Sequence, residues 1–193
     1  IKTPAEIEKM RVAGRLSGEV LLEGTLDRPR LRGHLASPRL FFGDEGIGAL
    51  EASLKGTGDG HLSIDARCLS GRVDLGITGS VGTVSPYDAD LQLEARDTSI
   101  DPFLRVVRRA LPSSVSLVAS GRMDLSGPLE RPEDMAASAS LADLRLLLPD
   151  YPIHSQGPVR LDLEGGRLRL AAFHLAGEGT DLEVDGTLDL LGD

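Results

Sequence analysis

Apolar and polar residues alternate with a period of two along nearly all of the chain after about residue 16. In HLSIDAR the apolar residues are Leu62, Ile64 and Ala66, and in DADLQLEAR they are Leu91 and Leu93. Successive side chains of a strand point to opposite faces of its sheet, so each segment has one apolar and one polar face. The pattern predicts about ten strands in an antiparallel sheet that contacts water on one side.

A repeated phrase supports this prediction. GEVLLEGTLDRP at 18–29 aligns with GRMDLSGPLERP at 121–132, and the GTLD of 24–27 recurs at 186–189. The two longer copies share Gly18/Gly121, Leu22/Leu125, Gly24/Gly127, Leu26/Leu129, Arg28/Arg131 and Pro29/Pro132. We expect a strand that bends at glycine and breaks at proline before the chain reverses. In LDLEGGRLRL, Gly165-Gly166 predicts a hairpin turn.

Two segments have the pattern of a helix instead. Thr3, Pro4 and Glu6 form a capping-box sequence, which predicts a helix over about 4–14. In DPFLRVVRRALP, Asp101 can cap a second helix that ends before Pro112. Its apolar stripe contains Phe103, Val106 and Val107, and its basic side contains Arg105, Arg108 and Arg109. This segment is either a connecting helix with a solvated basic side or a helix that contacts acyl chains and lipid phosphates.

Composition and charge narrow the classes of function. Hydrophobic residues make up 40% of the chain but aromatic residues only 3%, so the buried residues must be mainly Leu, Val, Ala and Ile. The formal net charge is -9, which repels polyanions, and we expect no nucleic-acid partner. The single cysteine, Cys68, cannot form an internal disulfide and has no zinc-ligand spacing around it.

Segments that would direct the chain to a membrane are missing from the sequence. No apolar run approaches the roughly 20 residues that cross a bilayer, and the N-terminus lacks the apolar core of a signal peptide. We therefore expect no transmembrane segment here. If the protein works outside the cytoplasm, its targeting segment is absent from this chain.

The order of these elements over about 16–193 resembles the repeating sheet of TamB/AsmA-like bacterial envelope proteins. The phrases that carry the resemblance are G-x-x-x-L-x-G-x-L-x-R-P, PVRLDLEGGRLRL and AAFHLAGEGTDLEVDGTLDL. In the last two, the matching positions are Gly165-Gly166, Phe173, Leu175, Gly177, Gly179-Thr180, Leu182, Val184 and Gly186.

The resemblance implies an elongated, U-shaped β-sheet that is open along one side and lined with aliphatic residues. Such proteins are anchored in the inner membrane, cross the periplasm, and are implicated in phospholipid movement to the outer membrane and in outer-membrane protein assembly. We accordingly expect localisation in the periplasm or cell envelope, with the inner-membrane anchor outside this chain. The implied partners are phospholipid acyl chains and an outer-membrane β-barrel, and no cofactor is expected.

The longest alternating strands supply the candidates for a lipid groove. These are Leu91, Leu93, Val115, Leu117, Leu161, Leu163, Leu168, Leu170, Leu182 and Val184. A groove for acyl chains needs a continuous apolar lining without buried charge. The same apolar faces could instead close on each other as a β-sandwich, which would make the chain a structural interaction module.

The first 16 residues, IKTPAEIEKMRVAGRL, resemble the N-terminal helix of methionine aminopeptidases. Catalysis in that family requires a dinuclear metal site of two Asp, one His and two Glu from a much longer domain. The histidines of this chain, at 34, 61, 154 and 174, all lie in alternating strand or loop sequence. We assign no catalytic or metal-binding residue and expect no enzymatic activity, so an aminopeptidase-related fragment is the less favoured alternative. The expected division is an N-terminal helix at 1–15 and a β domain at 16–193, with sub-units 16–100 and 113–193.

Overall fold

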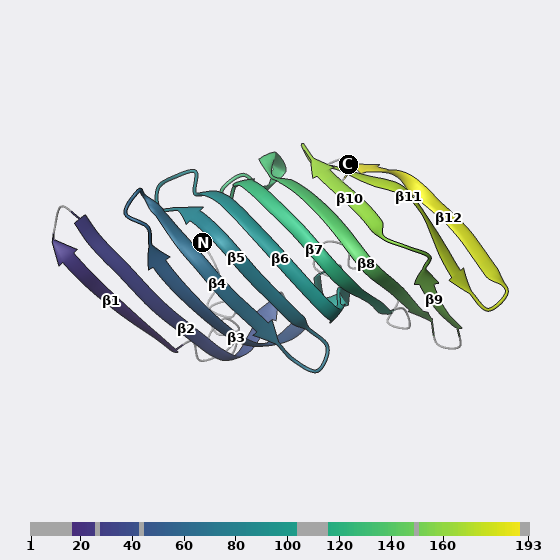
Figure 1. Ribbon diagram of the computed structural model, residues 1–193, viewed down its shortest axis with the longest axis horizontal. Helices are drawn as coiled ribbons and strands as arrows, with labels where there is room; N and C mark the ends of the chain where they lie inside the picture. The colour runs from purple at the N-terminus through teal and green to yellow at the C-terminus, as the bar shows by residue number, and fades with distance from the viewer. Residues whose placement is uncertain (1–16, 26–27, 43–44, 104–115, 149–150, 190–193) are drawn as a thin grey trace, which may run out of the picture.

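The computed structural model describes residues 17–25, 28–42, 45–103, 116–148 and 151–189, and these form one antiparallel sheet (Figure 1). Strands β1 to β6 span Ser17–Thr25, Arg28–Phe42, Glu45–Gly56, His61–Leu69, Asp74–Gly82 and Asp88–Ser99. Strands β7 to β12 span Ser116–Pro128, Ala136–Leu148, Tyr151–Ser155, Val159–Glu164, Arg167–Gly177 and Thr180–Asp189. A short 3-10 helix, η1, covers Pro132–Asp134. The prediction of an all-β fold is confirmed.

The sheet is a meander in which each strand up to β8 pairs with the next in sequence. Beyond β8 the order is β10, β11 and β12. Strand β9 also pairs with β8 and β11, so β9 and β10 together fill one strand position. Figure 1 shows the strands side by side from β1 to β12 along the long axis. Of the elongated sheet and the sandwich, the described residues form the elongated sheet.

The predicted hairpin at Gly165-Gly166 is confirmed. Strands β10 and β11 pair up to Glu164 and Arg167, which leaves the two glycines as the turn. Their φ angles are 55° and 73°, which only glycine adopts without strain and which a tight type I′ turn requires.

The break predicted at proline is wrong for the first copy of the repeat. Strand β2 begins at Arg28, and Pro29 lies within the β1–β2 ladder opposite Gly24. A proline is tolerated at the start of a strand, where few ladder hydrogen bonds are lost. In the second copy β7 ends at Pro128, and Pro132 begins η1 in the connection to β8.

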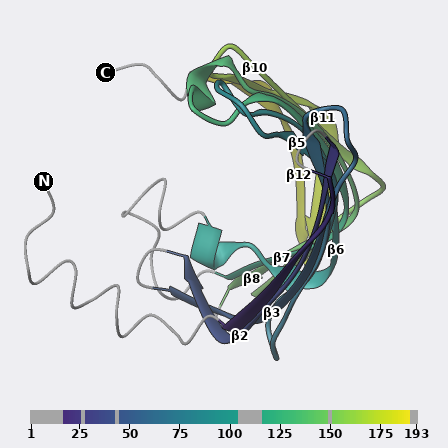
Figure 2. The same cartoon turned by 90° about the vertical axis from the view of Figure 1, so that its left-hand side faces the viewer.

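The sheet is strongly curved. Figure 2 shows a C-shaped profile in which all strands bend toward the same side. Four pairs of neighbouring strands shift register partway along their length, at Ser37/Leu40, Ala95/Thr98, Ser120/Gly121 and Leu170/Phe173, and the β2–β3 pair shifts again at Leu40/Phe41. Such bulges bend a strand and increase its twist, so this line of irregularities explains where the sheet folds over.

Residues 101–103 are helical, at the start of the second helix predicted from the sequence. The buried Asp101 carboxylate accepts hydrogen bonds from Ser116 Oγ and Leu117 N, both at 2.7 Å, and from Ser99 Oγ at 3.0 Å. Asp101 therefore ties the helical segment to the beginning of β7. The rest of that prediction, through 111, and the helix predicted at 4–14 lie outside the described residues. The expected sub-units 16–100 and 113–193 adjoin in one sheet, because β6 pairs with β7.

Gly79 provides a test of how closely β5 packs against β6. Its φ is +142°, and a Cβ atom would lie 2.1 Å from the Asp90 carbonyl oxygen of the neighbouring strand. We expect Gly79→Ala to lower the free energy of unfolding by about 2–4 kcal/mol in urea denaturation. The control is Gly71→Ala, where a Cβ atom meets nothing within 4 Å and which should change stability by less than about 0.5 kcal/mol. Equal effects of the two substitutions would contradict the strand register.

Candidate functional site

Cross-strand pairing aligns the apolar residues of ten strands into rows, which we call rungs. The first rung runs from β2 to β12 through Gly33, Leu54, Ile64, Gly79, Leu91, Leu125, Ala137, Leu163, Leu168 and Leu188. The second runs through Leu35, Ala52, Ala66, Ile77, Leu93, Met123, Ala139, Leu161, Leu170 and Gly186. The third crosses eight strands through Ser37, Leu50, Cys68, Leu75, Ala95, Gly121, Leu141 and Val159. We call the surface formed by these rungs the apolar face.

The three rungs contain no charged residue, and their one polar side chain is Ser37. The opposite face of the same strands is charged and exposed. One row of it runs through Asp65, Thr78, Gln92, Asp124, Ser138, Asp162, Arg169 and Thr187. There Arg67 donates from both Nε and Nη2 to Asp74 at 3.0–3.1 Å, and this pairing raises the pKa of Arg67. The two faces therefore differ completely in chemistry.

The apolar face is the concave one. Phe103 packs against the buried cluster of Ile47, Cys68 and Val73, and Cys68 belongs to the third rung. Figure 2 shows the short helical turn that contains Phe103 on the inner side of the curve. Because side chains alternate along each strand, the remaining rung residues share this inner side.

Burial on the apolar face is incomplete across most of its length. A second cluster, Ala119, Leu144, Val159 and Phe173, is buried near the C-terminal half. Most leucine and isoleucine side chains of the rungs are only partly buried. Most of their cover comes from neighbours on the same face, and within the described residues no second sheet lies over them. A surface of this size and composition is typical of a binding surface for an apolar ligand or partner.

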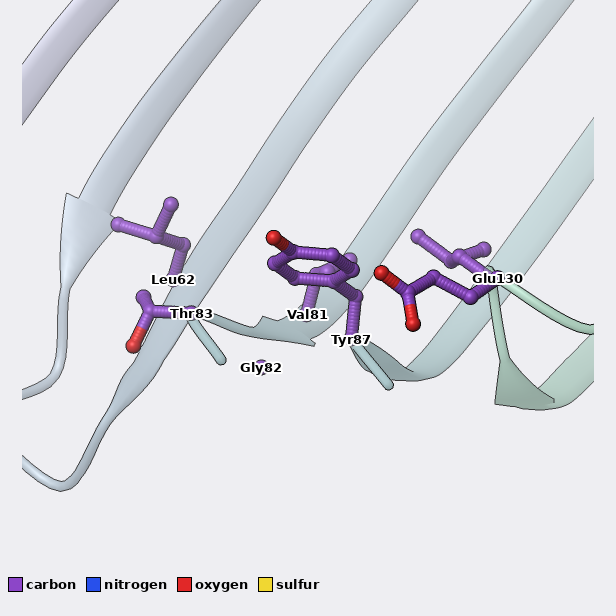
Figure 3. Close-up of a pocket in the computed structure, with 7 residues that line it drawn as sticks. Leu62, Val81, Gly82, Thr83, Tyr87 and Glu130 are labelled. Atoms are coloured by element: carbon purple, nitrogen blue, oxygen red, sulfur yellow. The ribbon is translucent and has the colours of Figure 1, made fainter. Parts of the chain in front are cut away.

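Two open pockets lie at opposite ends of the strands. The first, of about 410 Å³, is lined by Leu62, Val81, Gly82, Thr83, Tyr87, Leu129 and Glu130. Figure 3 shows Tyr87 between Leu62 and Glu130 in this pocket. The second, of about 280 Å³, is lined by Arg39, Leu40, Phe41, Gly46, Gly48, Ser70, Gly71 and Arg72. Each pocket contains residues from the margin of the apolar face.

The groove candidates chosen from the sequence lie on the apolar face, apart from Val115, which is outside the described residues. Leu91, Leu93, Leu161, Leu163, Leu168 and Leu170 belong to the first two rungs. Leu117 and Val184 pack against the cluster around Val159 and Phe173. Leu182 shares the same face of the edge strand β12 and is 46% exposed.

Sequence reasoning missed several parts of this site. Ile47 and Leu50 are three residues apart, so strict alternation would place them on opposite faces of β3. Ile47 nevertheless lies on the apolar face, because β3 is irregular at Gly48, where φ is +126°. The Gly46-Ile47-Gly48 sequence was the available signal, since isolated glycines in a strand indicate bulges. In the sequence Phe173 stands out only through the resemblance to the TamB/AsmA-like phrase, yet its side chain is 7% exposed and belongs to the buried cluster with Ala119 and Val159.

Within the described ranges no three His, Cys, Asp or Glu residues lie close enough together to hold a metal ion. In the same part of the chain no helix is long and apolar enough to cross a membrane. A scan against protein-family models found no match, and searches of curated proteins and of solved structures found none either.

Cys68 offers a chemical test of the apolar face. Its side chain is 2% exposed, and burial raises the pKa of the thiol. Because the buried thiol meets the reagent only when the sheet opens locally, and because less thiolate forms in the folded state, we expect a thiol reagent at about pH 8 to modify the folded protein about 100-fold more slowly than the protein in urea. Stability should also fall as the pH rises above 9.0, since the unfolded chain then loses this proton first. Equal rates of modification would show that this rung is open to water.

Proposed function

We propose that this chain is a non-catalytic part of an envelope protein that guides phospholipid acyl chains along its concave apolar face. The observation that carries the proposal is the chemistry of the rungs, which cross up to ten strands without a charged side chain. A single charge in such a row would be costly to cover with hydrocarbon.

The energetics favour acyl chains as the occupant. Covering a methylene group is worth about 0.8 kcal/mol, so a chain laid along the rungs gains free energy at every strand it crosses. Strands lie about 4.8 Å apart, so ten strands span roughly 43 Å, which exceeds the hydrocarbon depth of about 15 Å of one bilayer leaflet. The apolar face is thus long enough for several successive positions of one lipid. Its flexible aliphatic side chains do not impose a single pose.

The cellular context is part of the same proposal. The resemblance to TamB/AsmA-like proteins supports localisation in the periplasm, with an inner-membrane anchor in a segment outside this chain. It also supports an outer-membrane β-barrel as a protein partner. The elongated sheet with an apolar concave side is the architecture that this resemblance implies.

A structural β module that binds another protein is the second candidate. It is favoured by the exposed apolar side chains near the first pocket, where Val84, Tyr87 and Leu129 are 72%, 41% and 42% exposed. Such a module would bind its partner there and carry no lipid. The methionine aminopeptidase alternative rests on residues 1–16, which lie outside the described residues.

Native mass spectrometry of the full chain purified from bacterial envelope should separate these functions. We expect phospholipid to be bound to the wild-type protein and at least fivefold less of it to be bound to Ile77→Asp, which places a charge in the second rung. Thr78→Asp is the matched control, because the adjacent residue of β5 faces the opposite side. It should retain its lipid.

Circular dichroism of each variant establishes that the fold persists. If Ile77→Asp does not fold, Leu182→Asp carries the same test, because this side chain on the same face is already 46% exposed. A wild-type protein free of lipid, or equal loss of lipid from Ile77→Asp and Thr78→Asp, would contradict lipid guidance and favour the structural module.

A further inference from the structure

The second pocket combines two arginines with an apolar margin. It lies where the ends of β2 and β3 meet the turn between β4 and β5, and has a volume of about 280 Å³. Arg39 and Arg72 line it together with glycines, Ser70 and Leu40. The two arginines are 33 residues apart in sequence, and only the pairing of β2, β3 and β4 brings them together.

The backbone at Arg39 is fixed by a bulge. The β2–β3 register shifts between Ser37 and Leu40, so Arg39 falls within the irregular part of the strand. The Ser37 hydroxyl is buried and donates to the Arg39 carbonyl oxygen at 2.9 Å. Leu40 then turns onto the cluster of Ile47, Cys68 and Val73. The guanidinium is thus attached to a rigid position beside that cluster.

Arg72 is held by a tight turn. Ser70 N donates to the Val73 carbonyl oxygen at 2.7 Å, and Ser70 Oγ accepts from the amides of Arg72 and Val73 at 3.3 and 3.0 Å. The Arg72 carbonyl oxygen accepts from Ser99 N at 2.7 Å. The turn buries Val73 at 2% exposure and leaves the Arg72 side chain exposed.

Among the described residues neither arginine forms an ion pair with a carboxylate, and no carboxylate side chain lines the pocket. The lining of this pocket thus carries two positive charges and no negative one, on a chain whose net charge is -9. Guanidinium groups bind phosphate oxygens through charge-assisted hydrogen bonds. The pocket therefore has the chemistry of a phosphate site.

We propose that Arg39 and Arg72 bind the phosphate of a phospholipid whose acyl chains lie on the apolar face. The inference rests on the proposed function and assigns it a head-group site. Leu40 lines the pocket and also packs on the apolar cluster, so the polar and apolar parts of the site are contiguous. A phosphate joined to hydrocarbon satisfies both parts, whereas free phosphate satisfies only the first. The site also offsets the repulsion that an acidic protein exerts on an anionic lipid.

Calorimetric titration of the full chain with three soluble probes tests this assignment. The probes are dihexanoyl phosphatidic acid, dihexanoylglycerol, which has the same chains without phosphate, and inorganic phosphate. For the wild type we expect phosphatidic acid to bind at least about tenfold more tightly than either of the others. The double variant Arg39→Gln/Arg72→Gln should lose that advantage and leave the dihexanoylglycerol affinity unchanged. The control Arg160→Gln/Arg169→Gln removes two exposed arginines from the opposite face and should behave like wild type.

Each other outcome has a definite meaning. If both lipids bind equally and the double variant has no effect, the head-group site is wrong while lipid guidance stands. If neither lipid binds the wild type, the proposed function fails and the head-group site fails with it. If inorganic phosphate binds as tightly as phosphatidic acid, the pocket is a site for free anions and the lipid assignment is overturned.

Discussion

The structure depends on the register of a one-layer sheet. In a single layer, alternate residues face opposite sides, and a slip by one residue would exchange the charged and apolar faces of every strand beyond it. The rungs show that ten strands keep their apolar residues on the same side of the sheet, so that Leu54, Leu91 and Leu163 fall in the same row. Since little lies above these side chains among the described residues, their stabilisation comes from neighbours within the row. The same arrangement makes the face both the core of the fold and its candidate site.

The register shifts in four pairs of neighbouring strands turn this flat pattern into a trough. One shift in each pair begins at a residue of the second or third rung or directly beside it, so these shifts lie at a similar depth along their strands. At this level the face also acquires its best-buried residues, such as Cys68, Ala119 and Val159, because the sheet folds toward itself there. The register shifts thus account for the curvature of the sheet, for the burial of these residues and for the position of the second pocket.

Local pattern was sufficient to predict the strands, the Gly165-Gly166 turn and nearly all of the apolar face, because alternation is a property of each strand alone. The bulges could not be predicted in the same way, since a register shift depends on two strands and changes the phase of residues such as Ile47. Arg39 and Arg72 had no local signal at all. One lies in a bulge and the other in a turn, and their common environment exists only after three strands have paired.

In the proposed function, the long apolar face and the compact arginine pocket have different roles. Successive rungs are built from similar residues, so an acyl chain moving along them exchanges one set of aliphatic contacts for another with little change in free energy. Such a surface permits movement but does not determine where a lipid stops. A phosphate contact is directional, and the Ser37 and Ser70 hydrogen bonds hold the backbone from which the two arginine side chains extend. Position along the trough would then be set by the head group, while affinity for lipids in general would come from the aliphatic rungs.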